Sequence, residues 1–325
     1  MAPSEQQSFL EELLACIDSK ELALPTLPDA ALKLRKLIDD PNVSASQIVL
    51  AVSGDPIIAA QVIKTANSAA FSDKPPVASV KDAVSRLGYR LLHNTVLALT
   101  VGEMFRSANP VINQRLKLFW EHSRGVAAIS YVIAQRQKHL QPEHAMMAGL
   151  VHDIGALPVC LFAAKKGMSP DAETLESLIR KCHEQAGMRL LKSWNFPQDL
   201  IDAAADHEDF HRGEGNTTPA DYADVVAVAN PLERGSAKIT AWDNVASARR
   251  LAMSQEDCRN FLERFAEQVS AARSMLGMGK PAATTEADSA KAPASQVVSH
   301  PGSIEATGQP KKPGLFSALS GLLGK

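Results

Sequence analysis

The chain of 325 residues has 45% hydrophobic and 22% charged side chains, which is typical of a soluble protein with one large or two moderate domains. Its 34 basic and 36 acidic residues give a formal net charge of −2. This balance argues against a nucleic-acid partner, because such proteins normally carry a basic excess.

The four cysteines are scattered and form no CxxC pair, so the sequence predicts neither a zinc ribbon nor a disulfide framework. The acidic start of the chain lacks the basic and apolar blocks of a signal peptide, and no uninterrupted apolar run reaches the roughly 18 residues that span a bilayer. We therefore expect a cytoplasmic protein.

The first third of the chain shows a series of helix signals. Residues 5–20 have one apolar face, and we expect this helix to pack on the helical module that follows it. Helix starts are predicted at Ser44, which forms a capping box with Gln47, at Asp55–Pro56 and at Ser79. Helix stops are expected at Asn67–Ser68 and near Gly88. No alternating strand pattern appears in this half, which indicates an all-α fold.

Two extended stretches carry a resemblance to a known family. LPTLPDAALKLRKLIDDPNVSASQIVLAVSGDPIIAAQVIKTANSAAF and SVKDAVSRLGYRLLHNTVLALTVGEMF resemble the amino-terminal half of an HDOD domain, including its Asp-Pro, Asn-Ser and Ala-Val-x-x-Leu-Gly elements. The match runs from Leu24 to about Asn230. The resemblance implies an all-helical domain related to the HD phosphohydrolases and to the HD-GYP cyclic-dinucleotide phosphodiesterases, in a family whose members are typically regulatory.

This resemblance and the composition together predict five segments. We expect an N-terminal helix (1–23), the N-terminal helical part of the HDOD domain (24–110) and an HD-like helical bundle with a C-terminal helix (111–276). A disordered linker (277–314) and a short amphipathic helix (315–325) should follow, because the linker has too few large apolar residues to offset its ordering entropy.

The second half contains an unusual acidic residue in an apolar stretch. AMMAGLVHDIGALPVCLF, from Ala145 to Phe162, has helical periodicity and sets His152 and Asp153 in its middle. A buried carboxylate needs an imidazole, an arginine, backbone donors or a metal. Neighbouring predicted helices carry His122, His183 and His207, so these candidate ligands would come from four helices of a bundle.

Imidazole and carboxylate are suitable ligands for iron, manganese or zinc, which could activate water for phosphoester hydrolysis. The resemblance aligns His122 with the first histidine of the HD superfamily, His152–Asp153 with its namesake pair, and His183 and His207 with additional HD-GYP histidines. Two positions depart from the pattern: Asn230 replaces a metal-binding aspartate, and Asp206 replaces the first histidine of His-His-Glu. The Gly-Tyr-Pro element is absent.

Three interpretations of this centre stay open: a metal-free hydrogen-bonded core, metal binding without useful turnover, and efficient hydrolysis in which Asp153 would be catalytic. The departures favour the first two, because even the loss of a residue that only hydrogen-bonds to a metal ligand typically costs about 10 to 100-fold in metal affinity or activity. His93, His139, His144 and His211 have no family counterpart and are expected to make surface or local contacts.

The C-terminal third is expected to continue as a long amphipathic segment to Leu276. In the last eleven residues, one arc of a helix would carry the apolar side chains Leu315, Phe316, Leu319, Leu322 and Leu323. This short helix should fold only on a protein partner, on the chain itself or on an anionic membrane.

We therefore expect a bacterial-type, non-catalytic HDOD signal-transduction module that acts through protein–protein contacts and has a degenerate HD site. The first alternative is a metal-dependent phosphohydrolase that acts on a nucleotide or cyclic dinucleotide. The second is a scaffold held peripherally at the inner membrane by the C-terminal helix.

Overall fold

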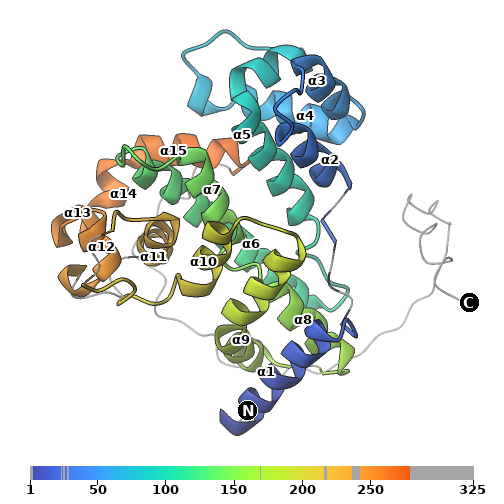
Figure 1. Ribbon diagram of the computed structural model, residues 1–325, viewed down its shortest axis with the longest axis vertical. Helices are drawn as coiled ribbons and strands as arrows, with labels where there is room; N and C mark the ends of the chain where they lie inside the picture. Colours follow the sequence, from blue (N-terminus) through green and yellow to red (C-terminus); the bar gives the residue numbers. More distant parts are fainter. Residues whose placement is uncertain are drawn as a thin grey trace, which may run out of the picture. The chain divides into compact units, whose positions relative to one another are not determined.

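The computed structural model describes residues 3–22, 24, 26–27, 29–168, 170–215, 218–235 and 242–278. Within these ranges the chain forms helices and no strand, which confirms the predicted all-α class (Figure 1). The described helices belong to one structural unit, Met1–Pro281. The amphipathic segment 315–325 and almost all of the linker 277–314 lie outside the described residues.

The helices before the central bundle are α1 (Pro3–Asp18), α2 (Asp29–Ile38), α3 (Ala45–Ser53), α4 (Pro56–Ala66), the 3-10 turn η1 (Ala69–Phe71) and α5 (Val80–Gly102). Those of the bundle are α6 (Pro110–Ala134), α7 (Pro142–Val151), α8 (Ala156–Lys165), α9 (Ala172–Ser193), α10 (Gln198–Asp206) and α11 (Tyr222–Glu233). The chain then forms η3 (Trp242–Asn244), α12 (Ala246–Arg250), α13 (Gln255–Arg259), α14 (Phe261–Arg264) and α15 (Ala266–Met275).

The predicted helix starts are present with the expected capping contacts. The Ser44 side chain accepts a hydrogen bond from the backbone N–H of Gln47 in a complete capping box, and Asp55 accepts from the first backbone N–H groups of α4. Ser79 caps α5, in which Gly88 adopts φ 69° and kinks the helix where the sequence predicted a stop. Local capping chemistry therefore accounts for the boundaries of the N-terminal helices.

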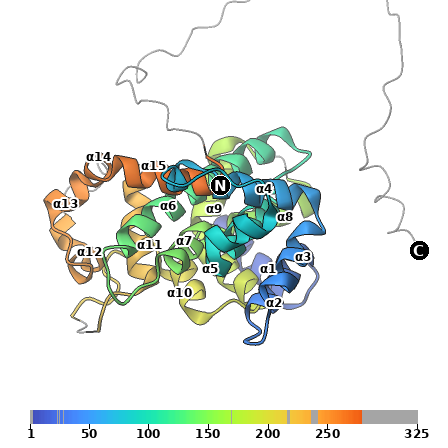
Figure 2. The same cartoon turned by 90° about the horizontal axis from the view of Figure 1, so that it is seen from above.

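Two groups of helices are joined by α5. Helices α2, α3 and α4 pack on α5, and α5 reaches the bundle by contacting α7 (Figure 1). In the bundle α6 packs along both α7 and α11, and α10 lies against α9 and α11. Helix α15 returns to contact α6, α4 and η1, so the end of the described chain meets both groups (Figure 2).

Helix α1 lies elsewhere than predicted. It packs on α9 of the bundle rather than on the first module, and its Phe9 ring meets Phe162 of α8 edge-on with centroids 5.0 Å apart. The apolar face of α1 was predicted correctly, but a single amphipathic stripe does not specify which neighbour covers it.

Two predicted continuous helices are interrupted. The stretch Ala145–Phe162 breaks into α7 and α8 at residues 152–155, and the C-terminal amphipathic segment breaks into α12 to α15. Apolar periodicity continues across both sets of breaks, so the sequence pattern alone did not reveal them.

By length and apolar composition, one described stretch could cross a membrane: Pro142–Lys165, whose most apolar window is 94% buried inside the protein. The bent pair α3 and α4, at 118°, passes the same test jointly. A buried core helix also passes it, so both results are weak evidence for a span.

Candidate metal centre

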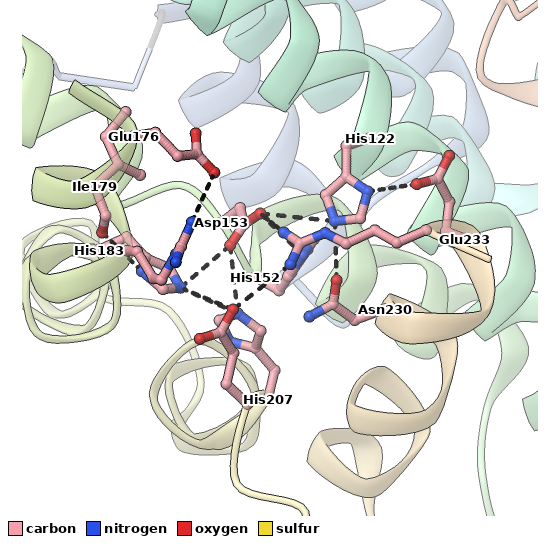
Figure 3. Close-up of polar contacts among 12 residues, drawn as sticks. His122, His152, Asp153, Glu176, Ile179, His183, His207, Asn230 and Glu233 are labelled. Carbon is pink, nitrogen blue, oxygen red and sulfur yellow. Dashed lines mark hydrogen bonds and ion pairs between the residues drawn. The ribbon is translucent and has the colours of Figure 1, made fainter. Parts of the chain in front are cut away.

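The five predicted ligand residues converge in the interior of the bundle (Figure 3). His122 projects from α6 and His183 from α9, and His207 directly follows α10. His152 and Asp153 lie in the turn between α7 and α8, not in the middle of a helix as predicted. The side chain of His122 is 12% exposed, and the other four residues are at most 3% exposed.

Two glycines allow the helices that carry these residues to approach closely. A Cβ atom on Gly149 would lie 2.7 Å from the Ala127 Cα of α6, and one on Gly155 would lie 1.8 Å from the carbonyl oxygen of His183. Neither position can accept a side chain without movement of a backbone. The backbone contact at Gly155 places the turn that carries Asp153 directly beside α9.

Asp153 is the shared neighbour of all four imidazoles. Its Oδ1 atom lies 3.4 Å from Nε2 of His183 and 3.3 Å from Nε2 of His207. Its Oδ2 atom lies 3.3 Å from Nε2 of His152 and 3.7 Å from Nε2 of His122. In every case the Nε2 atom, and not Nδ1, faces the carboxylate.

Backbone carbonyls set the tautomers of three rings. The Nδ1 atoms of His152, His183 and His207 lie 2.8, 2.9 and 3.2 Å from the carbonyl oxygens of Gly149, Ile179 and Ala204, respectively. A carbonyl oxygen can only accept, so each Nδ1 carries the proton and each neutral ring presents the Nε2 lone pair to the centre. Metal-binding histidines are commonly oriented in this way.

The resulting arrangement fits a divalent cation. The buried atoms His152 Nε2 and Asp153 Oδ1 have no hydrogen-bond partner among the described residues. Nε2 of His183 and Nε2 of His207 face each other at 3.3 Å. Two ligands of one ion with bonds of about 2.1 Å lie roughly 3.0 to 3.4 Å apart, which matches these spacings. Asp153, His183 and His207 thus form a group that could hold an ion.

His122 is engaged differently from the other three histidines. Its Nδ1 atom lies 2.5 Å from Glu233 Oε2, and its Nε2 atom lies 2.9 Å from Asn230 Oδ1 (Figure 3). With this amide orientation both ring nitrogens must donate; if the amide is rotated, the Asn230 N–H group donates to the Nε2 lone pair. In both orientations Asn230 contacts the ring nitrogen of His122 that faces Asp153. His122 also forms, with His152 and Asp153, a group that could hold an ion.

An arginine and further carboxylates surround the centre. Arg234, which follows α11, places Nη2 3.4 Å from Asp153 Oδ2 and Nη1 3.7 Å from Glu208 Oε1. His183, Glu184 and Glu208 form another group that could hold an ion. The guanidinium of Arg234 thus provides Asp153 with a fixed positive charge between two carboxylates.

Interactions with the imidazoles outweigh burial at Asp153. Burial alone would raise the pKa of this carboxyl, but His152, His207 and His183 hold its pKa well below the usual range. Burial lowers the pKa of His152 to about 4, against the opposing effect of Asp153. Burial also acts to lower the pKa of His207, yet its close interaction with the Asp153 carboxylate prevails and raises it. Without a cation, a balancing proton is therefore favoured on His207 over His152.

Asp206, one of the two departing positions, points to a different network. Its carboxylate accepts a hydrogen bond from Nε of Arg212 at 3.0 Å. Arg212 also makes two bonds to Asp221, at 2.9 and 2.8 Å, and lies 3.4 Å from the fully buried Asp224. Asp206 therefore helps to anchor the connection between α10 and α11, next to His207.

Residues 24–210, more than half of the chain, match the HDOD domain family. The chain belongs to this family. The resemblance seen in the sequence is thus confirmed, and the five predicted ligands all lie within the matched residues.

The HDOD chain is similar to several known proteins. A crystal structure from Shewanella amazonensis, named for a conjectured metal-dependent phosphohydrolase activity, is 25% identical with a TM-score of 0.70, and the match covers 84% of this chain and 99% of that one. An HDOD protein of unknown function from Geobacter sulfurreducens is 22% identical with a TM-score of 0.59, and the match covers 85% and 98% of the two chains. The likeness to the Geobacter sulfurreducens protein shows a shared fold and nothing about function.

A curated relative, an uncharacterized protein from Treponema pallidum, is 26% identical over 239 residues. The match covers 70% of the HDOD chain and 45% of the relative, so the chain spans less than half of the length of that relative.

Sequence reasoning missed the residues that surround the ligands. Glu233 and Arg234 lie within four residues of Asn230, and Glu208 directly follows His207, so proximity in sequence to the named positions was the available signal. The remaining histidines make local contacts away from the centre: His139 bonds the carbonyl oxygen of Ala220, while His144 and His211 pair with Asp199 and Glu214. His93 lines a separate cavity beside α2.

Proposed function

We propose that this HDOD protein is a signal-transduction module that acts through protein–protein contacts and not through catalysis. Its HD centre would hold a single divalent ion in the group formed by Asp153, His183 and His207, with His152 beside it. The observation that carries the proposal is the 2.9 Å contact between His122 and Asn230, which engages the nitrogen needed for a second ion.

The residues on the two sides of Asp153 support different expectations for metal binding. On one side, carbonyl-anchored imidazoles present their Nε2 atoms to Asp153 Oδ1. On the other side lies the neutral side chain of Asn230, at the position that the family resemblance aligns with a metal-binding aspartate. A bound divalent ion can lower the pKa of a coordinated water and stabilise negative charge on a phosphoryl oxygen. Because we expect no second ion at His122, we expect the single ion to stabilise the turn between α7 and α8 and not to support hydrolysis.

Metal content and turnover measured on the full chain test this proposal. The purified protein would be analysed for iron, manganese and zinc, and assayed with nucleotides, cyclic dinucleotides and a chromogenic phosphodiester. The expected result is one ion per chain and no turnover above that of the Asp153→Asn variant. Turnover by the wild type that Asp153→Asn abolishes would overturn the non-catalytic assignment.

The second candidate function is metal-dependent phosphoester hydrolysis. It is favoured by the buried His/Asp groups and by the likeness to the Shewanella amazonensis protein, whose name refers to that activity. In this case Asp153 and the imidazoles would hold the ions, and Arg115, Arg180 and Arg234, which line a cavity of about 490 Å³ with His122, would face the phosphate. The turnover assay above separates the two candidates.

Contact with a membrane through the C-terminal segment remains a prediction from sequence. Truncation after Gly279, followed by cell fractionation and affinity capture, tests it. A membrane scaffold requires that truncation releases the protein into the soluble fraction. An unchanged location and unchanged partners would contradict any role for the segment.

A further inference from the structure

A cavity of about 340 Å³ lies away from the metal centre, at the meeting point of both helix groups. Residues of α4, α5 and α6 line it, together with Met275, Leu276 and Gly277 at the end of α15. None of the five predicted ligands lines it. Trp120 and His122 are two positions apart on α6, so their side chains point to different sides of this helix.

The charged side chains around the cavity leave a positive excess. Lys64, Arg106, Lys117 and Arg124 face two carboxylates, Glu103 and Glu121. Arg106 bonds Glu103 at 2.9 Å, and Arg124 bonds Glu121 at 3.0 Å, so both carboxylates are already neutralised. Lys64 and Lys117 have no ion-pair partner among the described residues. Two ammonium groups on different helices are therefore left to attract an anion.

Two aromatic side chains, Phe105 and Trp120, also line the cavity. Trp120 is half-buried, and its ring packs against Phe105 with centroids 5.2 Å apart and planes inclined by 31°. Its indole N–H has no hydrogen-bond acceptor among the described residues. The Nε1 edge lies so close to α5 that a Cβ on Gly102 would come within 2.7 Å of it. Gly102 thus lets the indole reach the wall of the cavity.

We propose that this cavity binds a mononucleotide, with the phosphate between Lys64 and Lys117 and the base against Trp120, which the buried Phe105 supports from behind. A volume of about 340 Å³ falls within the usual range of small-molecule sites. Aromatic side chains bind bases by stacking regardless of base identity, and lysine ammonium groups commonly bind phosphate as point charges. Neither feature alone indicates a nucleotide, but their combination in one cavity favours a ligand that carries both a phosphate and a base.

A ligand in this cavity would contact helices of both groups. Lys64 belongs to α4, Lys117 belongs to α6, and α15 closes the cavity through bonds from Arg124 to the Leu276 carbonyl and from Thr65 to the Met275 carbonyl. A bound nucleotide would therefore tie the N-terminal helices to the bundle. The bound nucleotide would thus act as a regulatory signal, whether or not the HD centre binds metal.

Tryptophan fluorescence of the full chain tests the proposal directly. Of the three tryptophans, Trp194 is 7% exposed, Trp242 is fully buried, and Trp120 alone lines this cavity. The probes are AMP and GMP, with adenosine, guanosine and inorganic phosphate as partial ligands, and isothermal calorimetry as a second readout. We expect saturable binding of the nucleotides, about tenfold weaker binding of each partial ligand, and no emission change in Trp120→Phe.

Charge variants separate this site from the metal centre. Lys64→Ala/Lys117→Ala should weaken nucleotide binding at least about tenfold, while the matched double variant Lys33→Ala/Lys81→Ala, at exposed helix positions elsewhere, should bind as the wild type does. Asp153→Asn should also bind normally. The proposal is overturned by absence of saturable binding in both readouts, by equal binding of inorganic phosphate, or by binding that depends on Asp153 and not on the two lysines.

Discussion

Nε2 of His122 lies 2.9 Å from Oδ1 of Asn230, within a centre where the other three imidazoles direct Nε2 at Asp153. Glu233 holds the opposite nitrogen of His122, as a carboxylate does behind many metal-bound histidines. The ring is therefore well oriented for an ion, but its ligand nitrogen is already engaged. This contact distinguishes His122 from His152, His183 and His207, none of which bonds an amide side chain among the described residues.

Replacement of single histidines should reveal this asymmetry. His183→Ala removes a carbonyl-anchored ligand and should abolish stoichiometric metal binding. His122→Ala should leave the number of ions per chain unchanged, because this ring is bonded to Asn230. Metal analysis of the two purified variants checks the expectation, with His139→Ala as a control remote from the centre. Equal loss of metal in His122→Ala and His183→Ala would contradict it.

Arg234 should tune the affinity of the centre for cations. Its guanidinium lies 3.4 Å from Asp153 Oδ2, so it repels an incoming divalent ion while it balances the carboxylate in the metal-free protein. Arg234→Ala should bind zinc or manganese about tenfold more tightly and should be less stable without metal. Arg234→Lys keeps the charge and should behave nearly as the wild type does.

Chelator competition and thermal melting of the metal-free protein measure both effects. Arg180→Ala is the matched control, because Arg180 lines the same cavity but pairs with Glu176 at 3.9 Å. A zinc or manganese affinity that is unchanged in Arg234→Ala would show that the guanidinium does not oppose the ion.

Gly155 should be intolerant of any side chain. A Cβ there would lie 1.8 Å from the His183 carbonyl oxygen, so Gly155→Ala should lower the free energy of unfolding by about 3 kcal/mol and separate Asp153 from His183. Gly54→Ala is the control, because its Cβ would make only ordinary contacts of 3.5 and 3.6 Å. Urea unfolding of both variants provides the comparison, and equal stabilities would refute the close-approach argument.

His93 should contribute to acid sensitivity. Burial, followed by the charge of Arg35, lowers the pKa of His93 to about 4 from its ordinary value of 6.5. The unfolded chain therefore binds a proton more readily, and the stabilisation, which is complete above pH 6.5, is lost as the pH falls toward 4. The loss amounts to about 3 kcal/mol at most.

His93→Gln cannot take up this proton. Its free energy of unfolding should fall less steeply than that of the wild type between pH 6.5 and 4, as measured by urea unfolding at several pH values. Identical pH profiles for the two proteins would show that His93 is not responsible. His211→Gln is a suitable control, because the His211 side chain is 73% exposed.

The sequence was sufficient for features that depend on local chemistry. Ser44, Asp55 and Ser79 begin helices because their side chains accept bonds from backbone groups two or three residues ahead, and such short-range contacts are visible in the order of residues. The five candidate ligands were found because buried histidines and an aspartate stand out on apolar helix faces, and the resemblance to the HD superfamily indicated their convergence.

Features that depend on distant contacts could not be predicted. The break at residues 152–155 is coupled to the approach of Gly155 to α9, which no helical periodicity encodes. Asn230 was recognised as a departure from the family pattern, but its bond to His122 joins residues 108 positions apart. The same holds for Arg234, whose role as a countercharge depends on how α11 ends beside Asp153.

The proposal of a single-ion centre is best tested by the number of divalent ions bound per chain in the wild type and in Asn230→Asp. Aspartate at this position supplies the missing carboxylate and leaves Nε2 of His122 free to bind a metal. We expect one ion in the wild type, and two ions with measurable phosphodiester turnover in Asn230→Asp. Two ions and turnover already in the wild type would contradict it.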